Sequence, residues 1–76
     1  MQQTQRTEDF ALRLREARKA VHMTQAQLAE WCSVGDETVR SWEQGRTSPN
    51  AAYLGRICRA LGVSADRLLG IEVEAP

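Results

Sequence analysis

The feature that most constrains this chain is a capping pattern that recurs at predicted helix starts. A polar or small cap residue has one apolar residue directly before it and another four positions after it, a pair that clamps the chain where it enters a helix. The pattern is clearest at Thr24, where Met23 and Leu28 are the apolar pair and Gln27 completes a capping box. It recurs further along, with Val34 and Val39 around Gly35 and with Val63 and Leu68 around Ser64.

These starts, together with glycines that end helices, predict five helices. The first is expected from about Glu8 to Ala20 with Thr7 as its cap, and its apolar face is Phe10, Leu14, Ala17 and Val21. The third is expected from Asp36 to about Gln44. The fourth is predicted to begin with Ser48 as cap and Pro49 as its first residue, and Gly62 and Gly70 are predicted to end the fourth and fifth.

An all-α fold follows, because no alternating strand pattern or hairpin dipeptide is present. Only about Cys32 to Gly35 joins the second and third helices, so they should cross sharply, as in a helix-turn-helix. With 76 residues there is room for one domain, expected over residues 8–70. Residues 1–7 and 71–76 lack an apolar pattern of their own and are expected to be loose tails.

Several motifs in register resemble one known family. They are Thr24-Gln25-Ala26-Gln27-Leu28-Ala29-Glu30, then Val34, then Thr38-Val39-Arg40-Ser41-Trp42-Glu43-Gln44-Gly45-Arg46, then Pro49, and finally Ala60-Leu61-Gly62-Val63-Ser64 with Leu68-Leu69. This series looks like the phage repressor and Cro-type helix-turn-helix family, also called XRE-type, over about Phe10 to Leu69. The resemblance implies a five-helix DNA-binding domain whose third helix enters the major groove of double-stranded DNA.

The resemblance also implies which residues contact DNA. On the third helix the outward positions are Asp36, Glu37, Arg40 and Ser41, whereas Val39 faces the core and Trp42 either packs there or contacts a base. The loop that grips the backbone is Gln44, Gly45, Arg46 and Thr47, with Arg46 as the best phosphate ligand. Thr24 and Gln25 match a phosphate anchor and a base contact; the alternative is that Thr24 is only a cap and Gln25 is solvated.

Two departures from the family pattern concern the turn and the third helix. The family commonly has glycine where this chain has Ser33, and a Ser, Thr or Asn cap where it has Gly35. In addition, Asp36 and Glu37 occupy base-contacting positions, where carboxylates repel phosphate and accept hydrogen bonds only from groups such as cytosine N4. Either the site contains cytosines, or these two residues mainly stabilise the positive end of the helix dipole.

Arg18 and Glu43 match a family pair that forms a largely buried salt bridge between the first helix and the end of the third. We expect a structural role for this pair, because breaking a buried pair costs several kcal/mol. His22 is the only histidine and is interpreted as a helix-end residue, since a lone histidine lacks the partners that catalysis or metal binding requires. Cys32 and Cys58 are interpreted as core residues, with a disulfide or metal site as the alternative.

The charge of the chain is balanced, with ten basic and ten acidic residues, but its distribution is not. Residues 1–23 carry five positive and three negative charges, 24–43 one and four, 44–62 three and none, and 63–76 one and three. A local basic surface is therefore compatible with zero net charge. No apolar run approaches the roughly 20 residues of a membrane span, and no secretory signal pattern is present, so we expect a cytosolic protein.

The sequence therefore predicts a sequence-specific DNA-binding transcriptional regulator without cofactor, metal, membrane or small-molecule substrate, acting as a homodimer on half-sites ~34 Å apart. It is not expected to be an enzyme, because paired carboxylates, Cys/His sets and phosphate loops are lacking. The alternative is a protein-interaction module, antitoxin-like or a phage regulatory partner, that keeps the fold without reading DNA. Leu12, Trp31 and Tyr53 lie off the expected core faces and are either a partner surface or partly buried.

Overall fold

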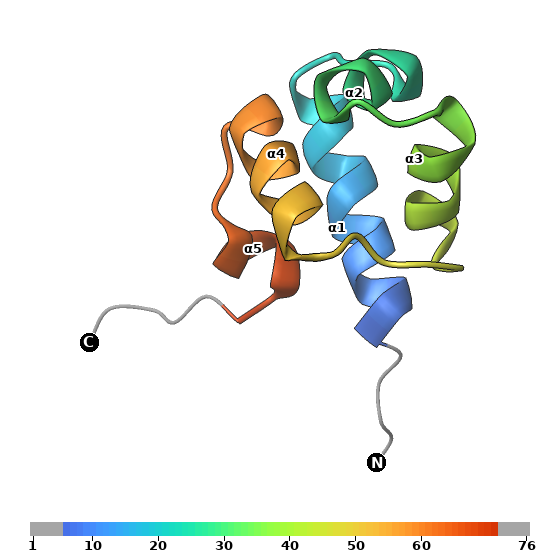
Figure 1. Cartoon of the computed structure of the whole chain (residues 1–76). Coiled ribbons are helices and arrows are strands. Elements are labelled where there is room, and N and C mark those ends of the chain that lie inside the picture. The colour runs from blue at the N-terminus through green and yellow to red at the C-terminus, as the bar shows by residue number, and fades with distance from the viewer. Residues whose placement is uncertain (1–5, 72–76) are drawn as a thin grey trace.

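The computed structural model describes residues 6–71, which form five α-helices and no strand (Figure 1). These are α1 (Arg6–Ala20), α2 (Gln25–Cys32), α3 (Asp36–Gln44), α4 (Ala51–Leu61) and α5 (Ala65–Leu69). The predicted all-α, five-helix class is confirmed. Most of both predicted tails, residues 1–5 and 72–76, lies outside the described part of the chain.

The helices pack around α1, which runs through the middle of the molecule (Figure 1). Helices α3 and α5 contact α1, and α2 contacts both α3 and α4. The core between them consists of Phe10, Leu14, Leu28, Ala29, Cys32, Val39, Trp42, Ile57, Leu61 and Leu68. All five helices contribute to this cluster, so the burial of apolar area fixes the positions of α2 and α3 relative to the other helices.

The first helix ends at Ala20 as predicted but differs from the prediction at its start and in its last apolar residue. It already includes Arg6, so Thr7 lies inside the first turn and is not the cap. At the other end the helix stops at Ala20, and His22 adopts the left-handed conformation with φ of 59°. Helical spacing no longer applies beyond that point. As a result Val21, predicted on the core face, is 44% exposed.

The fourth helix begins later than predicted. Its cap is Asn50, whose Oδ1 accepts a hydrogen bond from the Tyr53 amide at 2.9 Å, so Ser48 and Pro49 precede the helix. Asparagine and serine cap helices about equally well, and position alone does not tell which of two nearby candidates is used. The other predicted ends hold. Thr24 and Gln27 form the capping box, Ser64 caps α5, and Gly62 and Gly70 end α4 and α5 in the left-handed conformation.

The link between α2 and α3 is short and fixed by backbone bonds. Ser33 takes the left-handed conformation, with φ of 61°, and its amide reaches the carbonyls of Ala29 and Glu30. The Val34 amide also bonds Ala29, at 3.0 Å. Gly35 has an ordinary extended φ of −77° and does not use glycine's freedom. This chain has its glycine at position 35, two positions after the place where the family has one. The turn is nevertheless intact, because Ser33 adopts the left-handed conformation that usually favours glycine.

Candidate nucleic-acid interface

Helix α3 has one buried face and one exposed polar face. Val39 is fully buried and Trp42 is 3% exposed. The Trp42 ring lies 6.0 Å from that of Tyr53, with 47° between the ring planes, a tilted pair typical of packed aromatics. Trp42 is therefore a core residue and cannot contact a base. Tyr53 is partly buried beside it, so of the predicted partner residues only Leu12 and Trp31 are largely exposed.

The exposed face of α3 carries Asp36, Glu37, Arg40 and Gln44, with Ser41 partly exposed next to them. These positions follow helical spacing and form one surface. At its N-terminus no side chain caps the helix, because the cap is Gly35. The carboxylate of Glu37 folds back so far that a Cβ on Gly35 would lie 3.1 Å from one of its oxygens. This places negative charge beside the uncapped amides, where the helix dipole favours it.

Arg18 and Glu43 form the predicted ion pair, in a two-pronged geometry. Arg18 Nε donates to Glu43 Oε2 at 2.6 Å and Nη2 donates to Oε1 at 2.9 Å. The two residues are only 8% and 5% exposed. The hydrogen bond to Glu43 raises the pKa of Arg18, although burial opposes this, so the guanidinium stays charged. Arg18 Nη1 also donates to the Met23 carbonyl at 2.7 Å, which ties the end of α1 to the start of α2.

The start of α2 lies against the same ion pair. Gln25 Nε2 donates to Glu43 Oε1 at 3.0 Å, so the side chain predicted to be free for DNA or solvent is partly held by α3. Thr24 Oγ1 accepts from the Gln27 amide at 3.0 Å and is thus occupied as a cap, while Thr24 remains exposed. The sequence pattern did not predict the Gln25 contact, because it joins residues 18 positions apart through the fold.

The loop after α3 is hydrogen-bonded to the last turn where it leaves the helix. Gly45 has φ of 78° and donates its amide to the Ser41 and Trp42 carbonyls, and the Arg46 amide bonds Ser41 at 3.0 Å. The hydroxyls of Ser41 and Thr47 lie 2.9 Å apart and share a hydrogen bond. The side chains of Gln44, Arg46 and Thr47 are exposed. The structure thus brings the exposed cation of Arg46 next to the end of α3, and the Ser41–Thr47 bond is a feature that sequence reasoning missed.

The cysteines are two free thiols, with Cys32 fully buried and Cys58 partly buried. Burial raises the pKa of both thiols, which disfavours the reactive thiolate. Among the described side chains, residues 9–71, no three His, Cys, Asp or Glu side chains come together as metal ligands would. None of the described helices is both long and apolar enough to traverse a lipid bilayer.

Comparison with known proteins places this geometry among related chains. The family described as "Helix-turn-helix domain" matches residues 9–69. An uncharacterized HTH-type transcriptional regulator of Methanothermobacter thermautotrophicus is 45% identical over 49 residues, which cover 64% of this chain and 71% of that protein. The Type II methyltransferase M.SsoII of Shigella sonnei is 39% identical over 51 residues, or 63% of this chain. The match spans only 14% of the methyltransferase.

The fold itself is similar to that of the P22 c2 repressor protein, solved in complex with a synthetic operator. The TM-score is 0.78 at 32% sequence identity, and the match covers 83% of this chain and 96% of the repressor chain. The similar region therefore includes nearly the whole of that solved domain. This chain and the P22 c2 repressor chain therefore share the overall fold.

Proposed function

Because this chain belongs to the helix-turn-helix domain family, we propose that it is a sequence-specific DNA-binding transcriptional regulator. The repressor-type resemblance found in the sequence is confirmed by that family match and by the fold of the P22 c2 repressor. The single observation that carries the proposal is the exposed polar face of α3, held in place by buried Val39 and Trp42 and followed by exposed Arg46.

We assign base contacts to the middle and end of α3. Arg40, Ser41 and Gln44 lie on its exposed face, and their side chains offer donors and acceptors suited to base edges in the major groove. The bond between the Ser41 and Thr47 hydroxyls holds the loop close to this face. Asp36 and Glu37 are then mainly partners of the helix dipole, an assignment supported by the folded-back Glu37 carboxylate beside Gly35.

Phosphate contacts are assigned to the two flanks of α3. Arg46 and Thr47 supply a cation and a hydroxyl on one side. On the other side, the start of α2 presents Thr24 and backbone amides, and helix N-termini attract phosphate. The side-chain amide of Gln25, the first residue of α2, is hydrogen-bonded to Glu43 and is therefore oriented before DNA binds. Zero net charge is compatible with this proposal, because phosphates meet a local surface and not the average charge of the chain.

We further propose that two copies act as a dimer on a pseudo-palindromic operator, since one small domain buries little DNA interface. Exposed apolar residues support the idea that a partner copy is needed: Leu69 is 45% exposed, Ile71 58% and Leu12 47%. The role proposed is binding and not catalysis. The likeness to a methyltransferase covers 14% of that enzyme and gives no ground for a catalytic proposal.

The decisive experiment is selection of bound sequences from a random duplex pool, followed by titration of the best duplex and a scrambled control across salt concentrations. We expect an enriched, two-fold symmetric site, at least about a thousandfold preference over scrambled DNA, and affinity that falls with salt. Failure to enrich any sequence, with no binding to any duplex at low salt while the protein stays folded, would favour a protein-interaction module instead.

A further inference from the structure

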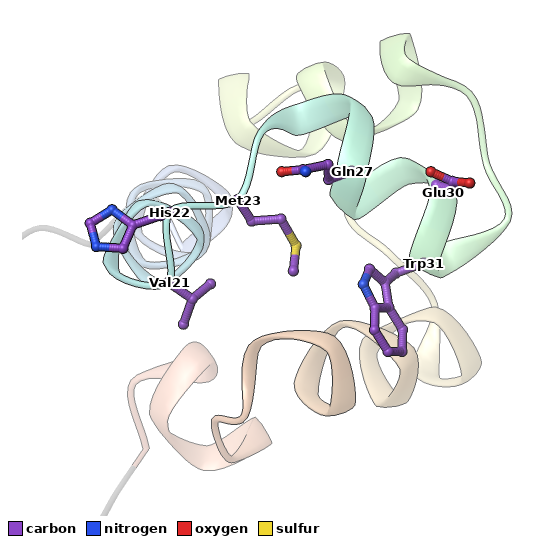
Figure 2. A pocket seen from close by; sticks show the side chains of 6 residues that line it. All are labelled: Val21, His22, Met23, Gln27, Glu30 and Trp31. Atoms are coloured by element: carbon purple, nitrogen blue, oxygen red, sulfur yellow. The ribbon is translucent and has the colours of Figure 1, made fainter.

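A groove of about 650 Å³ lies between the end of α1 and helix α2 (Figure 2). It is lined by Val21, His22, Met23, Gln27, Glu30 and Trp31. None of these residues belongs to α3 or to the Arg46 loop. The groove is therefore separate from the base-contacting face of α3, and it meets the proposed phosphate contacts only at the start of α2, where Met23 and Gln27 flank Thr24.

The apolar part of this groove is unusually open to solvent. Trp31 is 61% exposed and Val21 is 44% exposed, whereas the other tryptophan, Trp42, is 3% exposed. Figure 2 shows the side chains of Val21, Met23 and Trp31 projecting to the same side of the α2 ribbon, with Met23 between the other two. A solvent-exposed indole beside a groove offers a large apolar area to a partner, because burying apolar area is favourable.

The charge of the groove identifies the kind of partner. Glu30 is its only carboxylate, and no lysine or arginine is among the lining residues. Glu30 is exposed and makes no ion pair within residues 9–71, where the one ion pair is that of Arg18 and Glu43. Glu30 and Trp31 both line the groove. A planar guanidinium that stacks on an indole while it faces a carboxylate gains both a cation–π contact and an opposite charge.

We propose that this groove docks a segment of a partner protein in which an arginine is flanked by apolar side chains. The guanidinium stacks on Trp31 and pairs with Glu30, and the flanking apolar side chain fills the space over Val21 and Met23. The lining residues lie outside α3 and its following loop, so a docked partner leaves the base-contacting face free, although Met23 and Gln27 adjoin the α2 start that is assigned to phosphate. The inference goes beyond the proposed regulator role and does not depend on it.

The test uses the full chain and three capped hexapeptides, in which leucine alternates with arginine, glutamine or glutamate. Binding is followed by two-dimensional ¹⁵N NMR through the indole N–H signals of Trp31 and Trp42 and the backbone amides. With the arginine peptide we expect saturable shifts of the Trp31 indole and of residues 21–31, and no shift of the buried Trp42 indole. Binding should weaken about threefold when salt is raised from 20 to 300 mM, as a partly exposed charge pair requires.

Three variants separate the contacts. Trp31→Gln should weaken arginine-peptide binding at least about fivefold. Glu30→Gln should weaken it about threefold and remove the salt dependence. Leu12→Gln, at another exposed apolar residue, should leave it unchanged. All three positions are exposed, so the fold is expected to persist.

Four results would overturn the proposal. They are equal binding of the glutamate peptide, shifts that are centred away from residues 21–31, no saturable shift at millimolar peptide, and self-association that Trp31→Gln abolishes. The last outcome would show that a second copy occupies the groove. Loss of duplex binding, by contrast, would overturn the regulator role without affecting this result.

Discussion

The two ends of α3 are held in different ways. The last turn carries Glu43, which is bonded twice by Arg18 and once by Gln25, and it ends in a left-handed glycine cap. The first turn has Gly35 as its cap, with no side-chain hydrogen bond, and two exposed carboxylates. This contrast shows that α3 is anchored at its C-terminal end. Of the residues proposed to contact bases, Arg40 and Ser41 lie between the weakly capped start and Glu43, and Gln44 directly follows Glu43.

The largest effect is expected from removing Glu43, whose bonds hold the C-terminal end of α3. Glu43→Ala should lower the free energy of unfolding by about 3–5 kcal/mol, because it leaves the guanidinium of Arg18 buried without a charge partner. Thermal and urea unfolding followed by circular dichroism measure the loss. Glu30→Ala removes an exposed carboxylate on α2 and serves as the control, with a change within about 0.5 kcal/mol. An unchanged melting temperature for Glu43→Ala would show that the pair does not anchor α3.

The next effect is on binding, at the loop beyond the anchored end. Arg46→Gln should weaken duplex affinity about tenfold at low salt and reduce the slope of log affinity against log salt by about one, because one phosphate contact is lost. Filter binding or fluorescence anisotropy on selected and scrambled duplexes provides the measurement. Arg59→Gln removes an exposed arginine on α4 and should change neither quantity. Equal effects of the two substitutions would refute the assignment of Arg46 to phosphate.

The same contrast between the ends explains what the sequence could predict. Caps and glycine stops are local signals, so short patterns predict the start of α2, both ends of α3 and the C-terminal ends of α4 and α5. The choice between Ser48 and Asn50 as the cap of α4 was missed, since both candidates satisfy the same local rule. The exposure of Val21 was missed because helical spacing was extended one residue past the end of α1.

The contacts of the interface divide in the same way. The Arg18–Glu43 pair was expected only through the family resemblance, because the two residues are 25 positions apart in the chain. The bonds of Gln25 to Glu43 and of Ser41 to Thr47 had no local signal at all, since they depend on how the helices and the loop meet. For the groove, the sequence predicted only that Trp31 lies off the core faces, as either a partner surface or a partly buried residue, because a hollow between elements has no sequence pattern.

A smaller effect concerns the link before α3. Ser33→Gly should stabilise the fold by about 0.5–1 kcal/mol, because Ser33 holds a left-handed φ of 61° that costs a residue with a Cβ but not glycine. The greater freedom of glycine in the unfolded chain offsets part of this gain. Urea unfolding of Ser33→Gly beside Ser33→Ala gives the comparison, in which the alanine variant should be no more stable than the original chain. Destabilisation by glycine would mean that the serine hydroxyl contributes to the turn.

The smallest expected effect would make the two ends of α3 more alike. Gly35→Ser adds a side-chain acceptor at the cap, where φ of −77° and ψ of 161° suit serine, and should stabilise the fold by a few tenths of a kcal/mol. The new Cβ lies 3.1 Å from a Glu37 carboxylate oxygen, so that flexible side chain must move. The stabilisation by Gly35→Ser should therefore be larger when it is measured in the Glu37→Ala variant than when it is measured in the original chain. If Gly35→Ser stabilises the Glu37→Ala variant no more than the original chain, the Glu37 carboxylate does not compete for the helix start.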